Sequence, residues 1–564
     1  MEYLLTNFSI PDSKKTDSLF IQGKFTEEDG KIYITEDRFF NPERNLSELF
    51  SPGILSYAYS QLIVTPKTHE IRIQNDEIGT FPVYYYCHNN KVLVSNNIWR
   101  IISSLPEKEI EIDPLIIKSF FVQDRIPHEE FTFFKNIMQL PAASQLILNY
   151  STFKNSIKKY WSLVQDLSHA VNPDEATDEL YNALSLYFDK LSQKELGKIL
   201  GFGNSGGLDS RIIPAFAKEK GITLKGFIIG NEKPRNIFRS ISHTNAHEIA
   251  DNLGIEHYDI SYKIQKIEER LLLDIRNNPL SNSQIFKNPF HAIPSIDYMI
   301  CGGNGFIVSN DSNRWASFAP IKTKDEKISY LYRYLDKTRF STFQEKVNKT
   351  LFKSTPEYKK NILEFEKEIK PFIIDCYADF YERNKQKDNL SFIRSFHQSI
   401  VNKHSPNGGF ESISRTVPAY YLYFPYALSV SLKWPMEFFL NRKILSELLI
   451  RKFPKIAHIE DQKGKSLVKK QNETIRQTKL ILKGSGLDYR DWYSKDNRLK
   501  KEVKSILLTK NPIFEEIIGE IEIEKLTLLH PNILLDIVKV KKILDIVYFK
   551  QFGFIDNVPE YYIR

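Results

Sequence analysis

The chain has 564 residues, and its 78 basic and 70 acidic side chains give a formal net charge of +8. Hydrophobic residues make up 41% and charged residues 26%, a balance typical of packed globular proteins that excludes a disordered or collagen-like chain. The excess positive charge is dilute over this length, so charge alone does not indicate a nucleic-acid-binding protein. We therefore expect several globular domains.

The cysteines and the apolar segments exclude two further classes of protein. Cys87, Cys301 and Cys376 are far apart and lack metal-ligand spacing, so we predict neither a disulfide scaffold nor a zinc site built on them. The N-terminus has no basic stretch followed by an apolar run, unlike a secretory signal. The most apolar window, 417–440, contains three prolines and a lysine, which predicts buried core rather than a bilayer-spanning helix. We expect a cytoplasmic protein that does not insert into membranes.

The first hundred residues read as β-rich. Short alternating or apolar runs predict strands near Ile32, Ile63, Ile71, Val83 and Val92. Turn residues such as Asn89-Asn90 separate these runs. Successive strands with few helices between them favour a sandwich of sheets. We assign residues 1–110 to this domain and residues 111–171 to a connecting segment.

From about residue 172 the pattern changes to alternating helices and strands. Helical spacing of apolar residues predicts helices, and short apolar runs predict strands, in the order helix 174–191, strand 198–202, helix 209–220, strand 224–229 and helix 243–253. This alternation indicates a parallel α/β sheet. We assign residues 172–480 to this domain, with a mostly helical later part, and residues 481–564 to a helical C-terminal extension.

The most informative stretch is the turn between the strand 198–202 and the helix 209–220. Gly206 and Gly207 let the backbone approach a ligand closely, and the helix N-terminus adds partial positive charge, so the turn suits a phosphate. Ser205 and Ser210 add hydroxyl groups, and Asp209 is a candidate magnesium ligand. The plain alternative is an ordinary strand-to-helix turn with Asp209 as the helix cap.

Two other phosphate-binding patterns fit this stretch less well. The spacing Gly201-x-Gly203-x-x-Gly206, with Glu232 after the next strand, matches a dinucleotide-binding fingerprint, but a lone match of this kind is weak. A Walker A loop needs a lysine after its glycines, and none is present.

The segment 205–210, Ser-Gly-Gly-Leu-Asp-Ser, resembles the pyrophosphate loop of ATP pyrophosphatases, which cleave ATP between the α and β phosphates. Further segments resemble asparagine synthetases in family order: 242–257, 297–305, 413–418 and 454–465. Residues 75–86 resemble the amidotransferase half of those enzymes, and 113–161 resemble the bridge between the halves. The resemblance implies an Ntn-type amidotransferase-like sandwich followed by an adenine nucleotide α-hydrolase-like domain.

The resemblance also implies the residues of an ATP and Mg²⁺ site. Ser205, Gly206, Gly207 and Ser210 correspond to the diphosphate-binding positions, and Asp209 to a magnesium ligand. The main chain around Ile229 corresponds to the adenine-facing strand, and Gly302 and Gly303 to the second loop that contacts the nucleotide. Lys463 corresponds to the lysine that meets the activated intermediate, with Lys465 as the next candidate.

Two features depart from the family pattern. A glutamine-hydrolysing member needs a cysteine directly after Met1, but Glu2 stands there, and Asn75 replaces an arginine. We therefore predict that the first domain does not hydrolyse glutamine. The second loop also lacks the Asp-Glu pair of the family, and Asp311 is the nearest acidic residue, which makes it the second candidate magnesium ligand.

The resemblance implies an ATP-dependent ligase that forms an amide through an acyl-adenylate and releases AMP and diphosphate. The carboxylate belongs to a small molecule or a peptide, because family members without the cysteine include β-lactam synthetases and lasso-peptide cyclases as well as enzymes that use ammonia. We expect no nucleic acid or membrane partner, and a homodimer or biosynthetic partner proteins are compatible with the family.

Three alternative functions remain from the residues. A catalytically inactive binding or scaffold protein would form no AMP. A nicotinamide-dependent oxidoreductase would use Gly201–Gly206. A tRNA-modifying member of the superfamily needs a concentrated basic surface. Lastly, His243 and His247 have the i,i+4 spacing of a helical metal-binding pair, but no H-E-x-x-H pattern accompanies them, so we do not predict a metal there.

Overall fold

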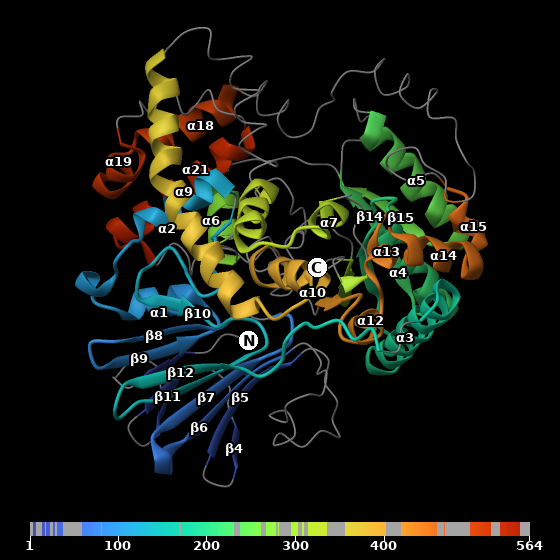
Figure 1. Ribbon diagram of the computed structural model, residues 1–564, viewed down its shortest axis with the longest axis horizontal. Coiled ribbons are helices and arrows are strands. Elements are labelled where there is room, and N and C mark those ends of the chain that lie inside the picture. The colour runs from blue at the N-terminus through green and yellow to red at the C-terminus, as the bar shows by residue number, and fades with distance from the viewer. Residues whose placement is uncertain are drawn as a thin grey trace.

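The computed structural model describes residues 4–6, 14–16, 19–22, 26–28, 31–37, 59–79, 82–123, 125–168, 171–229, 237–260, 267–277, 280, 295–302, 307–308, 314–335, 356–401, 419–459, 467, 497–519 and 531–552. An antiparallel β-rich half and a parallel α/β half lie side by side, with helices between and above them (Figure 1). Among the described helices, none has the length and hydropathy needed to cross a membrane.

The amino-terminal half contains two six-stranded antiparallel sheets. The first has the order β10-β8-β9-β1-β3-β2 and contains β1 (Leu4–Thr6), β2 (Lys14–Thr16), β3 (Leu19–Gln22), β8 (Tyr84–His88), β9 (Lys91–Ser95) and β10 (Ile137–Gln139). The second has the order β12-β11-β7-β6-β5-β4 and contains β4 (Thr26–Glu28), β5 (Lys31–Asp37), β6 (Tyr59–Thr65), β7 (Glu70–Asn75), β11 (Ser144–Asn149) and β12 (Lys154–Lys159). All five predicted strands are present.

The two sheets share one hydrophobic core. Ile71 and Ile73 of β7 pack in the same buried cluster as Val92 and Val94 of β9. Alternate residues of each strand point to the same face, so the i, i+2 spacing of these residues buries one face of each sheet against the other. The apolar runs in the sequence are therefore the inner faces of two stacked sheets; the amidotransferase type of this half stays a prediction.

The boundary that we predicted at residue 110 is wrong. Residues 111–171 supply α2 (Pro114–Gln123) and three strands, and β10 pairs with β8 while β11 pairs with β7. The strand β12 continues the second sheet at its edge. The β-rich half therefore extends to at least Lys159, because these strands complete sheets that the first hundred residues begin.

The second half contains a five-stranded parallel sheet with the order β15-β14-β13-β16-β17. Its strands are β13 (Leu200–Gly203), β14 (Leu224–Ile229), β15 (Glu256–Ile260), β16 (Tyr298–Cys301) and β17 (Ala419–Tyr421). The helices α3 (Pro173–Lys194), α4 (Leu208–Glu219) and α5 (Ile237–Leu253) alternate with the first strands, as predicted. After β13, the chain adds β14 and β15 on one side of that strand. It later adds β16 and β17 on the other side of β13. Ligands of open α/β sheets bind beside such a reversal of strand order.

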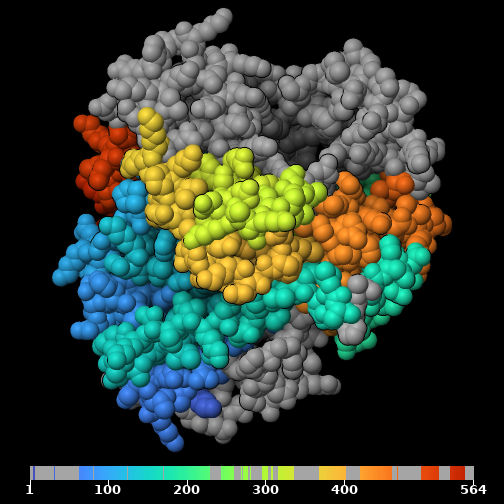
Figure 2. Space-filling model, in the orientation of Figure 1, coloured from blue at the N-terminus to red at the C-terminus, as the bar shows by residue number. Residues whose placement is uncertain are grey.

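Helices make up most of the remaining described chain. Their bounds are α1 (Ile98–Ser104), α6 (Ile267–Asn277), α7 (Arg314–Phe318), α9 (Pro356–Asn384), α10 (Asn389–Phe396), α12 (Tyr426–Ser431), α13 (Met436–Phe439), α14 (Lys443–Lys452) and α15 (Pro454–Ala457). On the face shown in Figure 2, described residues of segments 314–335 and 367–401 lie between the amino-terminal half and the residues 419–459. The apolar window that we expected in the core is largely buried over its described part, including Leu422, Phe424 and Trp434.

The C-terminal helices pack onto the amino-terminal half. The helices α18 (Asn497–Leu508), α19 (Pro512–Ile518) and α21 (Pro531–Tyr548) share a hydrophobic cluster with α1, α2 and α6. A buried ion pair joins Lys539 Nζ of α21 to Asp274 Oδ2 of α6 at 3.1 Å. The extension is therefore part of the folded body.

Candidate active site

The site is built around the turn that joins β13 to α4. Gly206 has φ +70°, a left-handed conformation that glycine adopts without steric cost. Gly207 is the N-cap residue of α4, and no side chain caps this helix end. No side chain accepts from the first N–H groups of α4, and an anion suits such a helix end because it carries partial positive charge.

Asn204 fixes the start of this turn to the neighbouring elements. Its backbone N–H donates to the carbonyl of Phe227 on β14 at 2.8 Å, and its side-chain Nδ2 donates to the carbonyl of Ala246 on α5 at 2.8 Å. The Asn204 side chain is buried, and its Oδ1 accepts from the Gly206 N–H at 3.3 Å. One buried amide therefore connects the turn to α5.

Arg211 ties the turn to a distant part of the chain. This guanidinium is fully buried and donates from Nε and Nη2 to the Gly206 carbonyl at 3.3 and 3.1 Å. Its Nη1 donates to the carbonyls of Ile456 and Ile459 at 3.0 and 2.6 Å. The backbone carbonyls accept the hydrogen bonds that the buried guanidinium offers. The Arg211 side chain therefore connects the turn to the carboxyl end of α15.

Asp209 does not cap α4, so the plain alternative of an Asp209-capped turn is wrong. Its Oδ1 accepts from the Tyr423 hydroxyl at 2.5 Å, and its Oδ2 lies 3.4 Å from Arg442 Nη1. Burial, together with the Asp209 charge, raises the pKa of Tyr423 well above its ordinary value, so the phenol stays protonated and donates to the carboxylate. Two side chains, Tyr423 and Arg442, therefore hold the Asp209 carboxylate in place.

Arg442 reaches Asp209 from an unusual backbone conformation. Asn441 and Arg442 have φ values of +54° and +56°, two successive left-handed residues that are not glycine. Such conformations cost about 1–2 kcal/mol each and persist where the surrounding structure imposes them. Arg442 immediately precedes α14, so this bend presents its guanidinium to the carboxylate.

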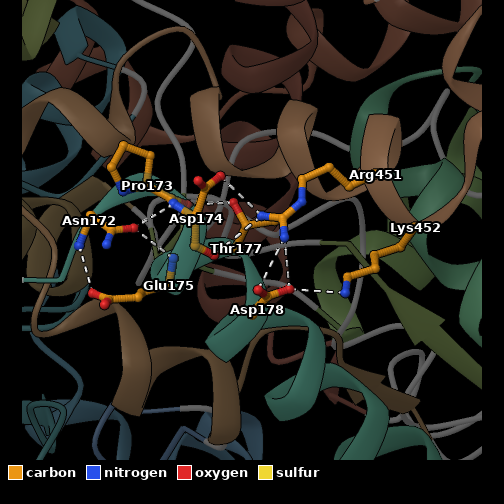
Figure 3. A network of polar contacts seen from close by, with 8 residues as sticks. All are labelled: Asn172, Pro173, Asp174, Glu175, Thr177, Asp178, Arg451 and Lys452. Atoms are coloured by element: carbon orange, nitrogen blue, oxygen red, sulfur yellow. Dashed lines mark hydrogen bonds and ion pairs between the residues drawn. The ribbon is translucent and has the colours of Figure 1, made fainter.

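The other end of α14 is anchored on α3 (Figure 3). Arg451 Nη2 lies 3.1 Å from Asp178 Oδ2, and Lys452 Nζ lies 2.9 Å from Asp178 Oδ1. These hydrogen bonds, that of Lys452 first, lower the pKa of the Asp178 carboxyl. The start of α3 is itself fixed by a capping box between Asn172 and Glu175. These contacts orient α14 at the end remote from Arg442.

The second predicted loop meets the turn at Gly302. A Cβ atom on Gly302 would lie 3.0 Å from the Asp209 Cβ, so the end of β16 runs directly against the first turn of α4. Only a residue without a side chain fits this approach unless the backbone shifts. Two segments that the sequence placed at one site are therefore brought together.

The remaining predicted residues fall into two groups. Ser205 is exposed and its Oγ lies 3.3 Å from Ser210 Oγ, while Ile229 ends β14, the strand beside β13. Gly303, Asp311 and Lys463 lie outside the described residues. Sequence reasoning missed Arg211, Tyr423 and Arg442. Arg211 directly follows the Ser-Gly-Gly-Leu-Asp-Ser segment, whereas no local pattern marks Tyr423 or Arg442.

Comparison with known proteins gives weak and partial similarities. No family model matches the chain. The chain is 25% identical over 166 residues to the tRNA-specific 2-thiouridylase MnmA of Streptococcus equi subsp. zooepidemicus, which covers 27% of this chain and 42% of that protein. It is 25% identical over 236 residues to the glutamine-hydrolyzing asparagine synthetase 1 of Bacillus subtilis, covering 41% of this chain and 34% of that enzyme.

Two solved structures show fainter likeness. An NMN synthetase from Francisella tularensis is 19% identical with a TM-score of 0.15, covering 29% of this chain and 71% of that one. An NH3-dependent NAD synthetase from Campylobacter jejuni is 11% identical with a TM-score of 0.17, covering 38% of this chain and 96% of that one. At these TM-scores neither carries an argument about this protein.

The chain spans less than half the length of the curated relatives that it matches. Both sequence matches support a relationship to the PP-loop ATP pyrophosphatases, in agreement with the segment 205–210. They do not single out asparagine synthetases within that superfamily.

Proposed function

We propose that this protein is an ATP-dependent ligase that forms a carbon–nitrogen bond through an acyl-adenylate. The observation that carries the proposal is the turn in which a left-handed Gly206 precedes the uncapped helix end at Gly207. This turn lies beside a fixed carboxylate, where the strand order of the parallel sheet reverses. An anionic ligand with a bound cation suits this combination, and the diphosphate of ATP is such a ligand.

The reaction has two steps. A substrate carboxylate oxygen attacks the α-phosphorus of ATP, the bond from that phosphorus to the α,β-bridging oxygen breaks, and diphosphate leaves with the electron pair. An amine then attacks the acyl carbon, loses a proton and expels AMP. Ser205, Gly206, Gly207 and Ser210 are the residues that we assign to diphosphate, and their N–H and hydroxyl groups stabilise the charge that builds on it.

The residues around Asp209 fit a magnesium ion. Mg²⁺ prefers carboxylate oxygens and keeps several of its own water ligands, and the Asp209 carboxylate is partly exposed. Asp209, with Asp311, would hold the ion, which neutralises charge on the phosphate oxygens when bound. Tyr423 and Arg442 fix the orientation of the carboxylate before any ligand arrives.

The position of Ile459 supports a role for Lys463 in the acyl-transfer step. Arg211 holds the Ile459 carbonyl and the Gly206 carbonyl with the same guanidinium. Lys463 follows four residues later, and four extended residues span at most about 14 Å. A lysine so close along the chain to a residue that Arg211 ties to the turn would offset the negative charge that develops during attack on the acyl carbon.

We also propose that the protein does not hydrolyse glutamine. Glu2 stands where a cysteine nucleophile is required, and Asn75, Asp76 and Glu77, at the start of the segment that resembles the amidotransferase half, are buried. The Asn75 carbonyl accepts from the Tyr160 hydroxyl at 2.6 Å, and the Glu77 carbonyl accepts from Gln398 of the helical segment after α10. The amine is therefore ammonia or an amino group of the substrate itself.

A second candidate function follows from the similarity to MnmA. A tRNA-modifying enzyme would also spend ATP at a PP-loop, with an RNA base in place of the carboxylate. The two proposals differ in the substrate that is adenylated. An experiment can therefore separate them by offering either a carboxylate or tRNA.

The test is exchange of labelled diphosphate into ATP. We expect exchange in the presence of a carboxylate, screened over amino acids and peptides, and none that depends on tRNA. Asp209→Asn is expected to lower the exchange rate at least about 100-fold, because it weakens both the cation site and the fixed charge. Asp325→Asn, which changes an exposed aspartate for which no contact with the turn is seen among the described residues, serves as the matched control and should leave the rate within about twofold.

The outcomes separate the candidates. Exchange that depends on tRNA would favour the second function over the ligase. Exchange that is equal in wild type and Asp209→Asn would remove Asp209 from the site. Failure of exchange with every substrate, together with absence of ATP binding, would support the inactive scaffold that the sequence left open.

A further inference from the structure

A second cluster of chemistry-bearing side chains lies where α5 covers β15. His243 and His247 lie one helical turn apart on α5 and so share a face of that helix. His257 and Asp259 are two residues apart on β15 and so point to the same face of the sheet. The ring centroids of His247 and His257 are 4.6 Å apart, which shows that these two faces meet.

The donor atoms of this cluster converge on one point. Asp259 Oδ2 lies 2.9 Å from His243 Nε2, and Asp259 Oδ1 lies 3.0 Å from His247 Nε2. One ligand atom from each of these three residues lies within 4.8 Å of the others. The three side chains are 21–39% exposed, so they are accessible to an ion and yet partly shielded from water.

His257 adds an imidazole behind the three. Its ring packs over Gly226 of β14, where an added Cβ would come within 2.9 Å of His257 Cδ2. Within the part of the chain that the structure describes, neither ring nitrogen of His257 has a hydrogen-bond partner, and both are buried. Buried imidazole nitrogens are normally hydrogen-bonded or coordinated, so these two require an explanation.

We propose that His243, His247 and Asp259 form a binding site for a divalent transition metal, with Zn²⁺ as the best fit. Two imidazoles and a carboxylate are the ligand types that Zn²⁺ prefers, and three protein ligands leave a fourth position for water or for His257. Tetrahedral bonds of about 2.0–2.1 Å place ligand atoms about 3.3 Å apart, so shifts of about 1 Å in side-chain position suffice.

This site differs in chemistry from the Asp209 site. Mg²⁺ takes oxygen ligands and gains little from imidazole, whereas Zn²⁺, Co²⁺ and Ni²⁺ bind imidazole well. The two histidines and the aspartate come from different elements, so a bound ion would clamp α5 onto the edge strand of the sheet. The clamp does not depend on the proposed ligase reaction.

The clamp has a direct route to the turn. Ala246 lies between the two metal-binding histidines on α5, and its carbonyl accepts from Asn204 Nδ2. Asn204 Oδ1 in turn accepts from the Gly206 N–H. A metal that fixes α5 therefore also restrains Asn204 and the turn between β13 and α4.

The test measures metal content rather than activity. Full-length protein is stripped with a chelator and dialysed against Zn²⁺, and the bound metal is determined by elemental analysis. We expect about one Zn²⁺ per chain that excess Mg²⁺ does not displace. Co²⁺ in the same site should show the intense visible absorption of a tetrahedral complex.

The variants make the test specific. His247→Ala and Asp259→Asn should each weaken Zn²⁺ binding at least about tenfold. His88→Ala, which removes an exposed histidine of β8, and Asp209→Asn should both keep the full metal content. Far-UV circular dichroism of each variant verifies folding, and His243→Gln serves as a milder substitution if His247→Ala does not fold.

Two results would overturn the proposal. The first is a metal content far below one Zn²⁺ per chain in folded wild-type protein, which would make the cluster a set of histidine–aspartate hydrogen bonds. The second is equal Zn²⁺ binding by wild type and the folded His247 and Asp259 variants, which would place the metal elsewhere.

Discussion

Two turns in this molecule contain similar residues, but the polar residues of one are buried and those of the other are partly exposed to solvent. The turn after β7 in the amino-terminal half contains Asp76 and Gly79, and the turn after β13 in the parallel half contains Gly206 and Asp209. Asn75, Asp76 and Glu77 are at most 1% exposed. Ser205, by contrast, is exposed, and Asp209 is partly exposed.

The hydrogen bonds of the two turns explain this difference. Asp76 accepts from the backbone N–H groups of Ile78, Gly79 and Ala143, all within the same half. The N-cap Gly207, in contrast, offers no side chain to satisfy its helix end. Similar residues therefore support the fold in one half and form the ligand site that we propose in the other, and the accessibility of their polar groups distinguishes the two turns.

The largest effect is expected at Arg211. Arg211→Met removes a fully buried guanidinium and leaves the Gly206, Ile456 and Ile459 carbonyls without a donor, so we expect a loss of about 3–5 kcal/mol in the free energy of unfolding. Arg451→Met, which removes the partly exposed ion pairs of Figure 3, should cost about 1 kcal/mol or less. Chemical denaturation of both variants tests this difference, and equal losses would contradict the tie between the turn and α15.

The second prediction separates backbone strain from ligand binding. Gly206→Ala and Gly197→Ala both place a side chain at positive φ, +70° and +76°, and each should cost about 1–2 kcal/mol of stability. Only Gly206→Ala should also weaken binding of Mg·ATP, by about tenfold or more, because it obstructs the turn. Calorimetric titration measures both affinities; a similar loss at Gly197, where an added Cβ meets nothing within 4 Å, would show a general effect.

The third prediction compares one tyrosine from each half. Tyr423→Phe removes the donor that orients Asp209, so the Kd for Mg·ATP should rise roughly threefold to tenfold, because the ligand loses only the orientation of the carboxylate and not the carboxylate itself. Tyr160→Phe removes the hydrogen bond to the Asn75 carbonyl and should cost about 1 kcal/mol of stability with an unchanged Kd. A change in Kd for Tyr160→Phe would mean that the sandwich shapes the nucleotide site.

The last prediction is that the protein has no glutaminase activity. Incubation with glutamine should release no glutamate above the rate without protein, since Glu2 offers no thiol nucleophile. An enzyme-coupled glutamate assay measures this release. Measurable hydrolysis would give the amino-terminal half a second active site and erase the contrast between the two turns.

Local patterns predicted much of the secondary structure and the turn. The segments β13, α4, β14 and α5 all appear where apolar periodicity placed them, because short-range spacing determines them. The pairing of β10, β11 and β12 with strands of the first hundred residues was not predicted, because sheet partners are set by contacts between distant residues.

The site shows the same limit. Gly206, Gly207 and Asp209 belong to one contiguous motif and were predicted together. Tyr423 and Arg442 reach Asp209 from more than 200 residues away, and tertiary packing alone brings them there. His243 and His247 were recognised as a helical pair, but Asp259, which completes the cluster, lies on a different element and carried no signal.

The most direct test of the central claim is a crystal structure of the protein with AMP, diphosphate and Mg²⁺. We predict diphosphate oxygens within hydrogen-bond distance of the Gly207 N–H and of the backbone N–H groups in the first turn of α4, and the cation at Asp209. A diphosphate bound elsewhere, or a turn that stays empty while AMP occupies the protein, would contradict the account.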